Sequence, residues 1–532
     1  MNADLILHHG TVITMDQNFQ LAEAVAVKDG KILATGSNDD ILQYSTSQTK
    51  IIDLEGKTVT PGFIDAHQHM INLGFNLANV NCRKASIEEV VSAIKKRAEA
   101  SRPDEWIIGW GYDEAGFKEN RNLHKGDFEG IPNPVYIMRY CHHAAVVNEK
   151  ALELAGITNE TTVINGIIER DDSGNVTGVL VEQGKSLVEN VMPPYTKKQM
   201  KNAVKLANDE YIKDGITSVH EAGLGFFSDA FKEFDVLKEM KKEGTLNVRM
   251  YVMVLQEVFE EFLEAYSSYE WDDHIKMGSM KFFGDGTLSG KTAAVSQDFK
   301  NSPGEKGMLL YSYEDLLERA KIAHSQNKQI AVHAIGDRTI NQVLDVYEKL
   351  YEDDPKPNLR HRIEHSTVSD ETILARMNKL GAIPVPQPPL VYFAGDVYME
   401  NLNEPAVQNV FANKNFIDAG LKPAGSSDCP IIPSSPLLGI AVAMDRMTIN
   451  NRVFIPDQRV SLREALSMYT INAAYASFEE DLKGSLEEGK LADMVILPEG
   501  FLHFTPEEIK GTEIEMTIIG GEVVYSKGTL KT

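Results

Sequence analysis

Cysteine is scarce in this chain: only 3 of its 532 residues are cysteines, at positions 82, 141 and 429. Their number is odd and no two of them form a Cys-x-x-Cys pair, which argues against a disulfide framework. The first residues also lack the basic start and the apolar core of a secretory signal peptide. We therefore expect a protein of the reducing cytoplasm.

Positively charged residues are also few. The sequence has 53 lysines and arginines but 78 aspartates and glutamates, which gives a formal net charge of −25. This balance repels nucleic-acid backbones and anionic membrane surfaces. Apolar runs of the roughly 20 residues that cross a bilayer are missing from the sequence. We expect a small-molecule substrate as the partner, no nucleic acid and no membrane, with a homodimer as the commonest default for a soluble enzyme.

Short β-rich runs separated by turns are present at both ends of the chain. Asp29-Gly30 is a hairpin turn between two such runs near the N-terminus, and Gly520-Gly521 joins two runs near the C-terminus. Neither end is long enough to bury a core alone. We predict that residues 1–58 and 485–532 combine into one small composite β-sandwich domain, which requires the two ends to meet.

The middle of the chain, residues 59–484, alternates apolar β-branched runs with helical stretches. Eight such alternations predict an α/β fold, a (β/α)8 TIM-like barrel with its active site at the carboxyl ends of the strands. The predicted strands end within 62–69, 135–143, 215–221, 280–285, 329–337, 360–366, 382–387 and 423–428. The wide spacing between strands 1 and 3 predicts a cap or insertion within 70–215.

Two histidines two residues apart close the first predicted strand. The side chains of His67 and His69 point to the same side of a strand, so both imidazoles can reach one metal ion. The alternative is a pair of hydrogen-bonded structural histidines. Their place at the barrel mouth favours metal ligands.

Three further polar residues each close a predicted strand of the barrel. His333 and His365 end two apolar runs, where a single histidine would most often be a core residue. Asp428 ends the eighth run, where a carboxylate can bind metal and take a proton from water, although it could also simply cap a loop. Together with His67 and His69, these residues predict a metal centre.

Four sequence motifs resemble those of one protein family. They are Gly-Phe-Ile-Asp-Ala-His-Gln-His (62–69), Val-His-Ala-Ile-Gly-Asp (332–337), Arg-Ile-Glu-His (362–365) and Ser-Ser-Asp-Cys-Pro (426–430). They are similar to those of the metal-dependent amidohydrolase superfamily, and the match is closest to its YtcJ-like (amidohydrolase-3) branch. Stretches beginning at Trp106, Gly178, Lys281 and Gly489 support that branch, so the resemblance spans nearly the whole chain.

The resemblance implies one or two divalent metal ions, usually zinc. In the members with two ions, a carboxylated lysine on the fourth strand bridges the metals, and Lys281 stands where that lysine would be. Otherwise Lys281 caps the strand or pairs with Asp285, and the site holds one ion. The implied ligand set is His67, His69, Lys281, His333, His365 and Asp428.

The expected activity is metal-dependent hydrolysis of a non-peptide carbon–nitrogen bond, an amide or cyclic amide. Metal-activated water attacks the carbonyl, and Asp428 accepts the proton of that water and later delivers it to the leaving nitrogen. His365 is the second expected catalytic residue. The alternatives are hydrolytic deamination, another reaction of the same centre, or a non-catalytic scaffold. Four residues are weaker candidates for contact with the substrate: His143, His220, Glu182 and Trp110.

Overall fold

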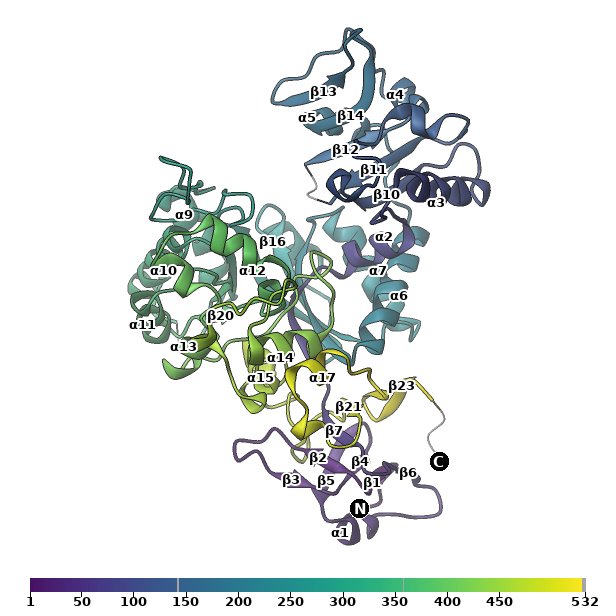
Figure 1. Cartoon of the computed structure of the whole chain (residues 1–532). Coiled ribbons are helices and arrows are strands. Elements are labelled where there is room, and N and C mark those ends of the chain that lie inside the picture. The colour runs from purple at the N-terminus through teal and green to yellow at the C-terminus, as the bar shows by residue number, and fades with distance from the viewer. Residues whose placement is uncertain (141–142, 357, 529–532) are drawn as a thin grey trace. The chain divides into compact units, whose positions relative to one another are not determined.

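The computed structural model describes residues 1–140, 143–356 and 358–528 and divides the chain into two compact units (Figure 1). Unit 1 comprises Met1–Met70 together with Asn208–Thr532, and unit 2 comprises Ile71–Ala207. Two helices, α2 (Met70–Ala78) and α6 (Lys197–Lys213), carry the chain from one unit to the other. The domain limits predicted above and the capping role of 70–215 stay predictions.

The largest sheet of unit 1 contains seven strands that all run parallel. In spatial order they are β8 (Phe63–Gln68), β15 (Ile216–Leu224), β16 (Arg249–Leu255), β17 (Ile275–Phe283), β18 (Ile330–Ala334), β19 (Arg362–His365) and β20 (Ile383–Val385). Most of their residues are buried, as expected for a parallel sheet covered on both faces. The fold is mixed α/β, with a nearly closed barrel of parallel strands.

The gap between β20 and β8 is filled by an irregular extended segment, residues 423–428. Ala424 N donates to Pro384 O of β20 (3.0 Å), and Ala66 N of β8 donates to Gly425 O (3.2 Å). The run predicted as an eighth strand therefore lies in the eighth position, without forming a regular strand. It brings Asp428 beside the end of β8.

One predicted barrel strand is wrong, and one barrel strand was missed. The run at 135–143 contributes β11 (Val135–Arg139) to the sheet of unit 2, whereas β15 pairs directly with β8. The missed strand is β16, so the run at 215–221 belongs to the second barrel strand rather than the third. The insertion accordingly separates strands 1 and 2. An apolar run predicts a buried strand but does not identify its partner, because pairing is a long-range property.

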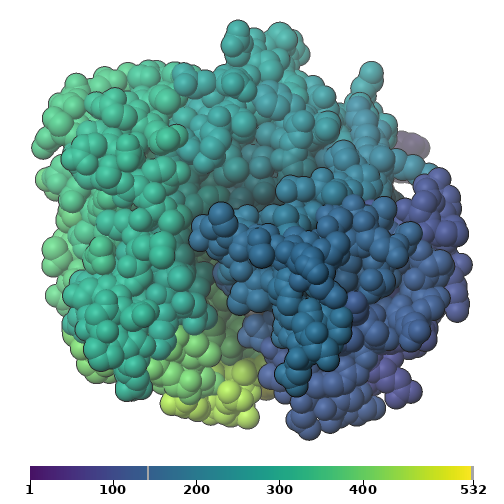
Figure 2. Space-filling model, turned by 90° about the horizontal axis from the view of Figure 1, so that it is seen from above, coloured from purple at the N-terminus to yellow at the C-terminus, as the bar shows by residue number. Residues whose placement is uncertain are grey.

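Helices follow the barrel strands in unit 1. They are α7 (Ala230–Lys242), α8 (Phe259–Ala265), α9 (Tyr313–Ser325), α10 (Asp337–Asp353), α11 (Glu371–Leu380), α12 (Pro389–Asn401), α13 (Asn413–Asp418), α14 (Pro436–Asp445), α15 (Leu462–Met468) and α16 (Ile471–Ala476). The segments around α9 to α13 form a teal-to-green surface in Figure 2. Ser312 and Asp370 cap α9 and α11 by accepting backbone N–H bonds, which satisfies donors that a helix start leaves free.

Strands from the chain ends form two further sheets of unit 1, and the second of them combines strands from both ends. One has the order β5 (Lys31–Gly36), β4 (Ala24–Lys28), β1 (Leu5–His8) and β6 (Lys50–Asp53). The other has the order β23 (Glu522–Ser526), β22 (Met516–Ile519), β21 (Met494–Leu497), β7 (Thr58–Pro61), β2 (Thr11–Ile13) and β3 (Leu21–Ala22). The pairing of β21 with β7 joins the two chain ends. Short helices α1 (Asn38–Leu42) and α17 (Pro506–Lys510) belong to the same end segments.

Unit 2 is built on its own mixed sheet. Its strands, in spatial order, are β13 (Gly166–Arg170), β14 (Val176–Glu182), β12 (Ala144–Val147), β11, β10 (Ile107–Tyr112) and β9 (Val80–Asn81). Helices α3 (Ile87–Glu99), α4 (Glu149–Leu154) and α5 (Gln183–Glu189) accompany it. Buried side chains such as Ile94, Tyr112 and Ile137 form an apolar core within this unit. Across the described part of the chain, none of the helices combines the length and apolar composition needed to cross a bilayer.

A buried ion pair connects the barrel to the strands at the C-terminal end. The guanidinium of Arg249 in β16 binds both oxygens of Asp493, just before β21, at 2.7 and 3.1 Å. Asp493 also accepts from the backbone N–H of Gly520 (2.8 Å). Removing one partner leaves an uncompensated buried charge, which is the costly case.

We therefore expect Arg249→Met and Asp493→Asn each to lower the free energy of unfolding by about 3–5 kcal/mol. The double variant should lose less than the sum of the two. Lys349→Met is the control, because Lys349 and Asp353 form an exposed pair within α10, and exposed pairs contribute little to stability. Thermal and urea unfolding followed by circular dichroism measure the effect. Equal stability of the Arg249 and Lys349 variants would contradict it.

Candidate metal centre

The predicted ligands lie at the carboxyl ends of four barrel strands and of the segment that occupies the eighth strand position. His67 and His69 end β8, Lys281 lies on β17, His333 on β18 and His365 at the end of β19. Asp428 follows the irregular segment between β20 and β8, with its N–H bonded to His67 O (2.8 Å). Since parallel strands of a barrel all end on the same face, these side chains converge there.

His67, His69 and Asp428 form the tightest group. One ligand atom of each lies within 4.8 Å of the others. Asp428 Oδ1 is 3.5 Å from His67 Nε2 and 3.3 Å from His69 Nε2. Two imidazole nitrogens and one carboxylate oxygen are a common zinc-binding set with an open fourth position. These three residues fit a divalent ion without rearrangement of the backbone.

His365 and His333 extend this group around the barrel. The ring of His365 lies 4.8 Å from that of His67 and 4.3 Å from that of His333, centroid to centroid. His365 Nδ1 contacts Gln387 Oε1 at 2.7 Å. Gln387 donates through its nitrogen to Val385 O, so its oxygen is the acceptor and His365 Nδ1 is the donor. The other nitrogen of His365, Nε2, is then left with a lone pair for a metal.

The orientation of His67 is set by a buried carboxylate. His67 Nδ1 donates to Glu364 Oε2 at 2.6 Å, which leaves Nε2 with its lone pair directed at Asp428. Arg362 in turn donates to both oxygens of Glu364, at 2.7 and 3.0 Å. Burial alone would raise the pKa of Glu364, but the charges of Arg362 and Lys281 hold that pKa below its usual value. Glu364 therefore stays ionised and keeps His67 in the metal-binding tautomer.

Three histidines of the site, His67, His333 and His365, are held neutral. Burial, together with the positive charge of Lys281, lowers the pKa of His333 to about 3. Burial likewise lowers the pKa values of His67 and His365 well below the usual range. A neutral imidazole is the form that binds a metal ion, so no proton has to be displaced at neutral pH.

Lys281 is a fully buried side chain of the site without a hydrogen-bond acceptor among the described residues. Its Nζ lies 5.1 Å from the ring centroid of Phe283. Burial lowers the pKa of Lys281 to about 8, against the opposing charges of Glu364 and Asp428. A buried amine without an acceptor fits conversion into an anionic ligand better than it fits a structural role.

Asp65 fastens the two chain segments that supply the tightest group. Its carboxylate accepts from His67 N (3.1 Å), from Ser427 N (3.1 Å) and from the Ser427 hydroxyl. Asp428, next in the chain, has a left-handed backbone with φ of 61°, and His365 has φ of 69°. Non-glycine residues adopt this conformation at a cost, and such strain clusters at functional sites. Asp65 supplies hydrogen bonds that hold the Asp428 segment in place.

Several of these supporting residues were missed by sequence reasoning. They are Asp65, Arg362, Glu364 and Gln387, and the aromatic residues Phe226 and Phe227. Asp65 and Glu364 stand inside the quoted motifs, two and one residues before a ligand, and polar residues at buried strand positions were the available signal. The rings of Phe226 and Phe227 lie 5.8 and 5.4 Å from that of His69, centroid to centroid. No local pattern in the sequence predicts that these two rings lie at the site.

The four weaker candidates for contact with the substrate are divided between the two units. His220 is fully buried on β15, and its Nδ1 accepts from Arg362 (2.9 Å), which suits a residue that supports Glu364. The other three belong to unit 2. His143 Nδ1 contacts Glu182 Oε1 at 2.7 Å and both side chains are exposed, whereas Trp110 donates to Asn76 O at 2.7 Å. Contact of these residues with a substrate stays a prediction.

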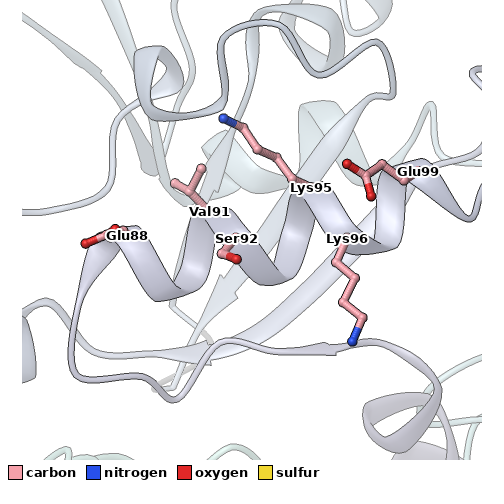
Figure 3. Close-up of a pocket in the computed structure, with 6 residues that line it drawn as sticks. All are labelled: Glu88, Val91, Ser92, Lys95, Lys96 and Glu99. Atoms are coloured by element: carbon pink, nitrogen blue, oxygen red, sulfur yellow. The ribbon is translucent and has the colours of Figure 1, made fainter.

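A shallow surface depression of unit 2 gathers no comparable chemistry. It follows helix α3 and is lined by Glu88, Val91, Ser92, Lys95, Lys96 and Glu99 (Figure 3). Lys95 and Lys96 point in different directions from the helix in that view. The convergent polar groups of a catalytic site are in the barrel instead.

Glu364→Gln tests the carboxylate that holds His67. The neutral amide keeps the size of the side chain but no longer selects the His67 tautomer, so we expect zinc affinity to fall by about 10–100-fold. Competition with a chromogenic chelator measures the affinity, and circular dichroism checks folding. Glu371→Gln, an exposed change in the first turn of α11, should leave the affinity unchanged. Equal affinities of the two variants would contradict this role for Glu364.

Comparison with known proteins identifies the family of the chain. A profile of the amidohydrolase family matches residues 50–525. The putative amidohydrolase YtcJ of Bacillus subtilis is 30% identical over 98% of this chain and 99% of its own length. An N-substituted formamide deformylase of Arthrobacter pascens is 27% identical over 98% of both chains.

A solved structure agrees as well. It is that of an uncharacterized metal-dependent hydrolase from Pyrococcus horikoshii, with a TM-score of 0.80 and 26% identity over 94% of this chain and 99% of that one. The family profile covers most of the chain, and the relatives align with it almost end to end. The chain therefore belongs to the amidohydrolase family, within which its relatives include YtcJ and metal-dependent hydrolases.

Proposed function

We propose that this protein hydrolyses a non-peptide carbon–nitrogen bond of a small molecule, an amide or cyclic amide, with a metal-activated water and Asp428 as the proton shuttle. The observation that carries the proposal is the cluster of His67, His69 and Asp428, whose ligand atoms lie within 4.8 Å of one another. Membership of the amidohydrolase family supports the same chemistry.

The donor set suits one or two divalent ions, with zinc as the first choice. His67, His69 and Asp428 would hold one ion, and His333 and His365 a second, with Lys281 between them as a carboxylated ligand. The metal supplies a water of lowered pKa and polarises the carbonyl of the substrate. With a single ion, Lys281 stays an unmodified amine.

Asp428 is positioned to move the proton. Its Oδ1 lies 3.5 Å from His67 Nε2 and 3.3 Å from His69 Nε2, and its side chain is 15% exposed. The carboxylate takes a proton from the attacking water and later gives it to the leaving nitrogen. His365 is the second catalytic residue in this proposal, because its ring lies 4.8 Å from that of His67 and its Nε2 is not used in the contact with Gln387.

The substrate class is proposed from the lining of the site. Phe226 and Phe227 lie beside His69, and the ring of Phe283 lies 4.9 Å from that of Phe226. Aromatic walls favour an apolar substituent next to the reacting bond. Because one relative is named an N-substituted formamide deformylase, N-aryl and N-alkyl formamides are the first compounds to screen. Deamination of the same compounds' amino analogues is the alternative reaction to assay.

Asp428→Asn tests the proton shuttle. We expect kcat to fall by about 100- to 10,000-fold, because general acid–base catalysis contributes an effect of that size. The assay is release of the amine from the best substrate of the screen. Asp457→Asn is the control, an exposed aspartate that should leave the rate unchanged. Hydrolysis by the Asp428 variant at the wild-type rate would remove Asp428 from the mechanism.

Lys281→Met tests the second ion. A carboxylated lysine forms from neutral amine and carbon dioxide, and burial favours the neutral amine. Metal-free wild-type protein should therefore recover more zinc with bicarbonate than without it. Lys281→Met should hold one zinc fewer per chain and show no bicarbonate effect, whereas exposed Lys379→Met should behave as the wild type. Equal zinc content in all three would favour a site with one ion.

A further inference from the structure

A second group of metal-binding residues lies outside the barrel, in the sheet that contains β1 and β6. One ring nitrogen each of His8 and His9 and a carboxylate oxygen of Asp53 lie within 4.8 Å of one another. The two strands run parallel, and His8 is the register partner of Asp53. Both strands therefore end at the same level, and the three side chains come from that shared end.

The backbone at His9 makes this arrangement possible. Successive side chains of a strand point to opposite faces, so adjacent histidines do not normally meet. His9 has a left-handed conformation with φ of 56°, and its ring centroid lies 4.0 Å from that of His8. Its N–H donates to Asn38 Oδ1 (2.8 Å), and its carbonyl accepts from Gly56 N (2.8 Å). Hydrogen bonds to the N–H and to the carbonyl of His9 thus hold this left-handed residue in place.

Asp53 presents one oxygen to the imidazoles. Its Oδ1 accepts from Glu55 N at 2.9 Å, which orients the carboxylate. Its Oδ2 lies 3.0 Å from His9 Nδ1. Neighbouring ligand atoms around a tetrahedral zinc ion with bonds of about 2.0–2.1 Å lie about 3.3 Å apart, so this spacing needs little adjustment.

His8 adds an independent observation. Its Nδ1 is buried and has no hydrogen-bond partner in the described parts of the chain. A buried imidazole nitrogen without a partner is costly unless another group satisfies it. An ordinary histidine–aspartate hydrogen bond accounts for His9 and Asp53, but it leaves that nitrogen unexplained.

We propose that His8, His9 and Asp53 form a second metal site, which binds a divalent transition-metal ion such as Zn²⁺. Two imidazoles and a carboxylate select zinc, nickel or copper over calcium and magnesium, which prefer oxygen ligands. The side chains of His9 and Asp53 are 52% and 41% exposed, so the ion keeps contact with solvent and retains water in its open position. An ion here connects the ends of β1 and β6 and stabilises that sheet.

His9→Asn is the variant that tests the site with the least damage. Asparagine tolerates a left-handed backbone, so the turn is preserved while a ligand is removed. Untagged full-length protein is dialysed against zinc and then against buffer, and zinc per chain is measured by elemental analysis. The wild type and the control variant His503→Asn, which changes another exposed histidine, should each hold one zinc more than His9→Asn. Equal zinc content in all three overturns the proposal.

A second comparison separates this site from the barrel. In a His67→Asn/His69→Asn background, adding His9→Asn should still remove one zinc per chain, because the two sites share no residue.

Asp53→Asn should weaken zinc binding to the site of His8 and His9 at least tenfold in a competition titration, since it removes the only charged ligand. Bound Cu²⁺ should show two nitrogen ligands by electron paramagnetic resonance in that background and one after His9→Asn. An unchanged affinity or an unchanged copper spectrum contradicts the assignment.

Discussion

The hydrogen bond between His67 and Glu364 is the contact on which the candidate centre depends. It joins the first barrel strand to the sixth, strands that are not neighbours in the sheet. Its 2.6 Å length and complete burial mean that neither group has water as an alternative partner. The charge of Glu364 is stabilised by Arg362, which also binds Ala66 O of β8 at 2.6 Å. One buried ion pair therefore aligns both the strand and the ligand that it carries.

The candidate ligands could be placed at the barrel mouth from the sequence because they follow a local rule. A polar residue that closes an apolar run marks a strand end, and strand ends meet on one face of a parallel barrel. The rule located His67, His69, His333, His365 and Asp428 without knowledge of strand order. It failed for the run at 135–143, whose apolar pattern is the same in either sheet, and β16 was missed.

The supporting residues were not predictable for a different reason. Gln387 acquires its role only because its amide meets His365, 22 positions earlier in the chain, and Arg362 because it meets His220, 142 positions earlier. Such pairs are set by the closure of the barrel rather than by spacing along one strand. The same holds for His8 and His9, where the adjacent pair is visible in the sequence but Asp53 joins it only through the pairing of β1 with β6.

The two candidate metal-binding groups differ in how deeply their side chains are buried. At the barrel, burial lowers the pKa of His333 to about 3 and leaves Lys281 without an acceptor, so the site is assembled at a cost that the fold must offset. The strained backbone at His365 and Asp428 adds to that cost. In the sheet that contains β1 and β6, the side chains of His9 and Asp53 are exposed, and left-handed backbone occurs at His9 and at Glu55. If the proposed sites hold, buried candidate ligands oriented by hydrogen bonds suit the proposed catalysis, whereas exposed candidate ligands suit the proposed ion between two strands.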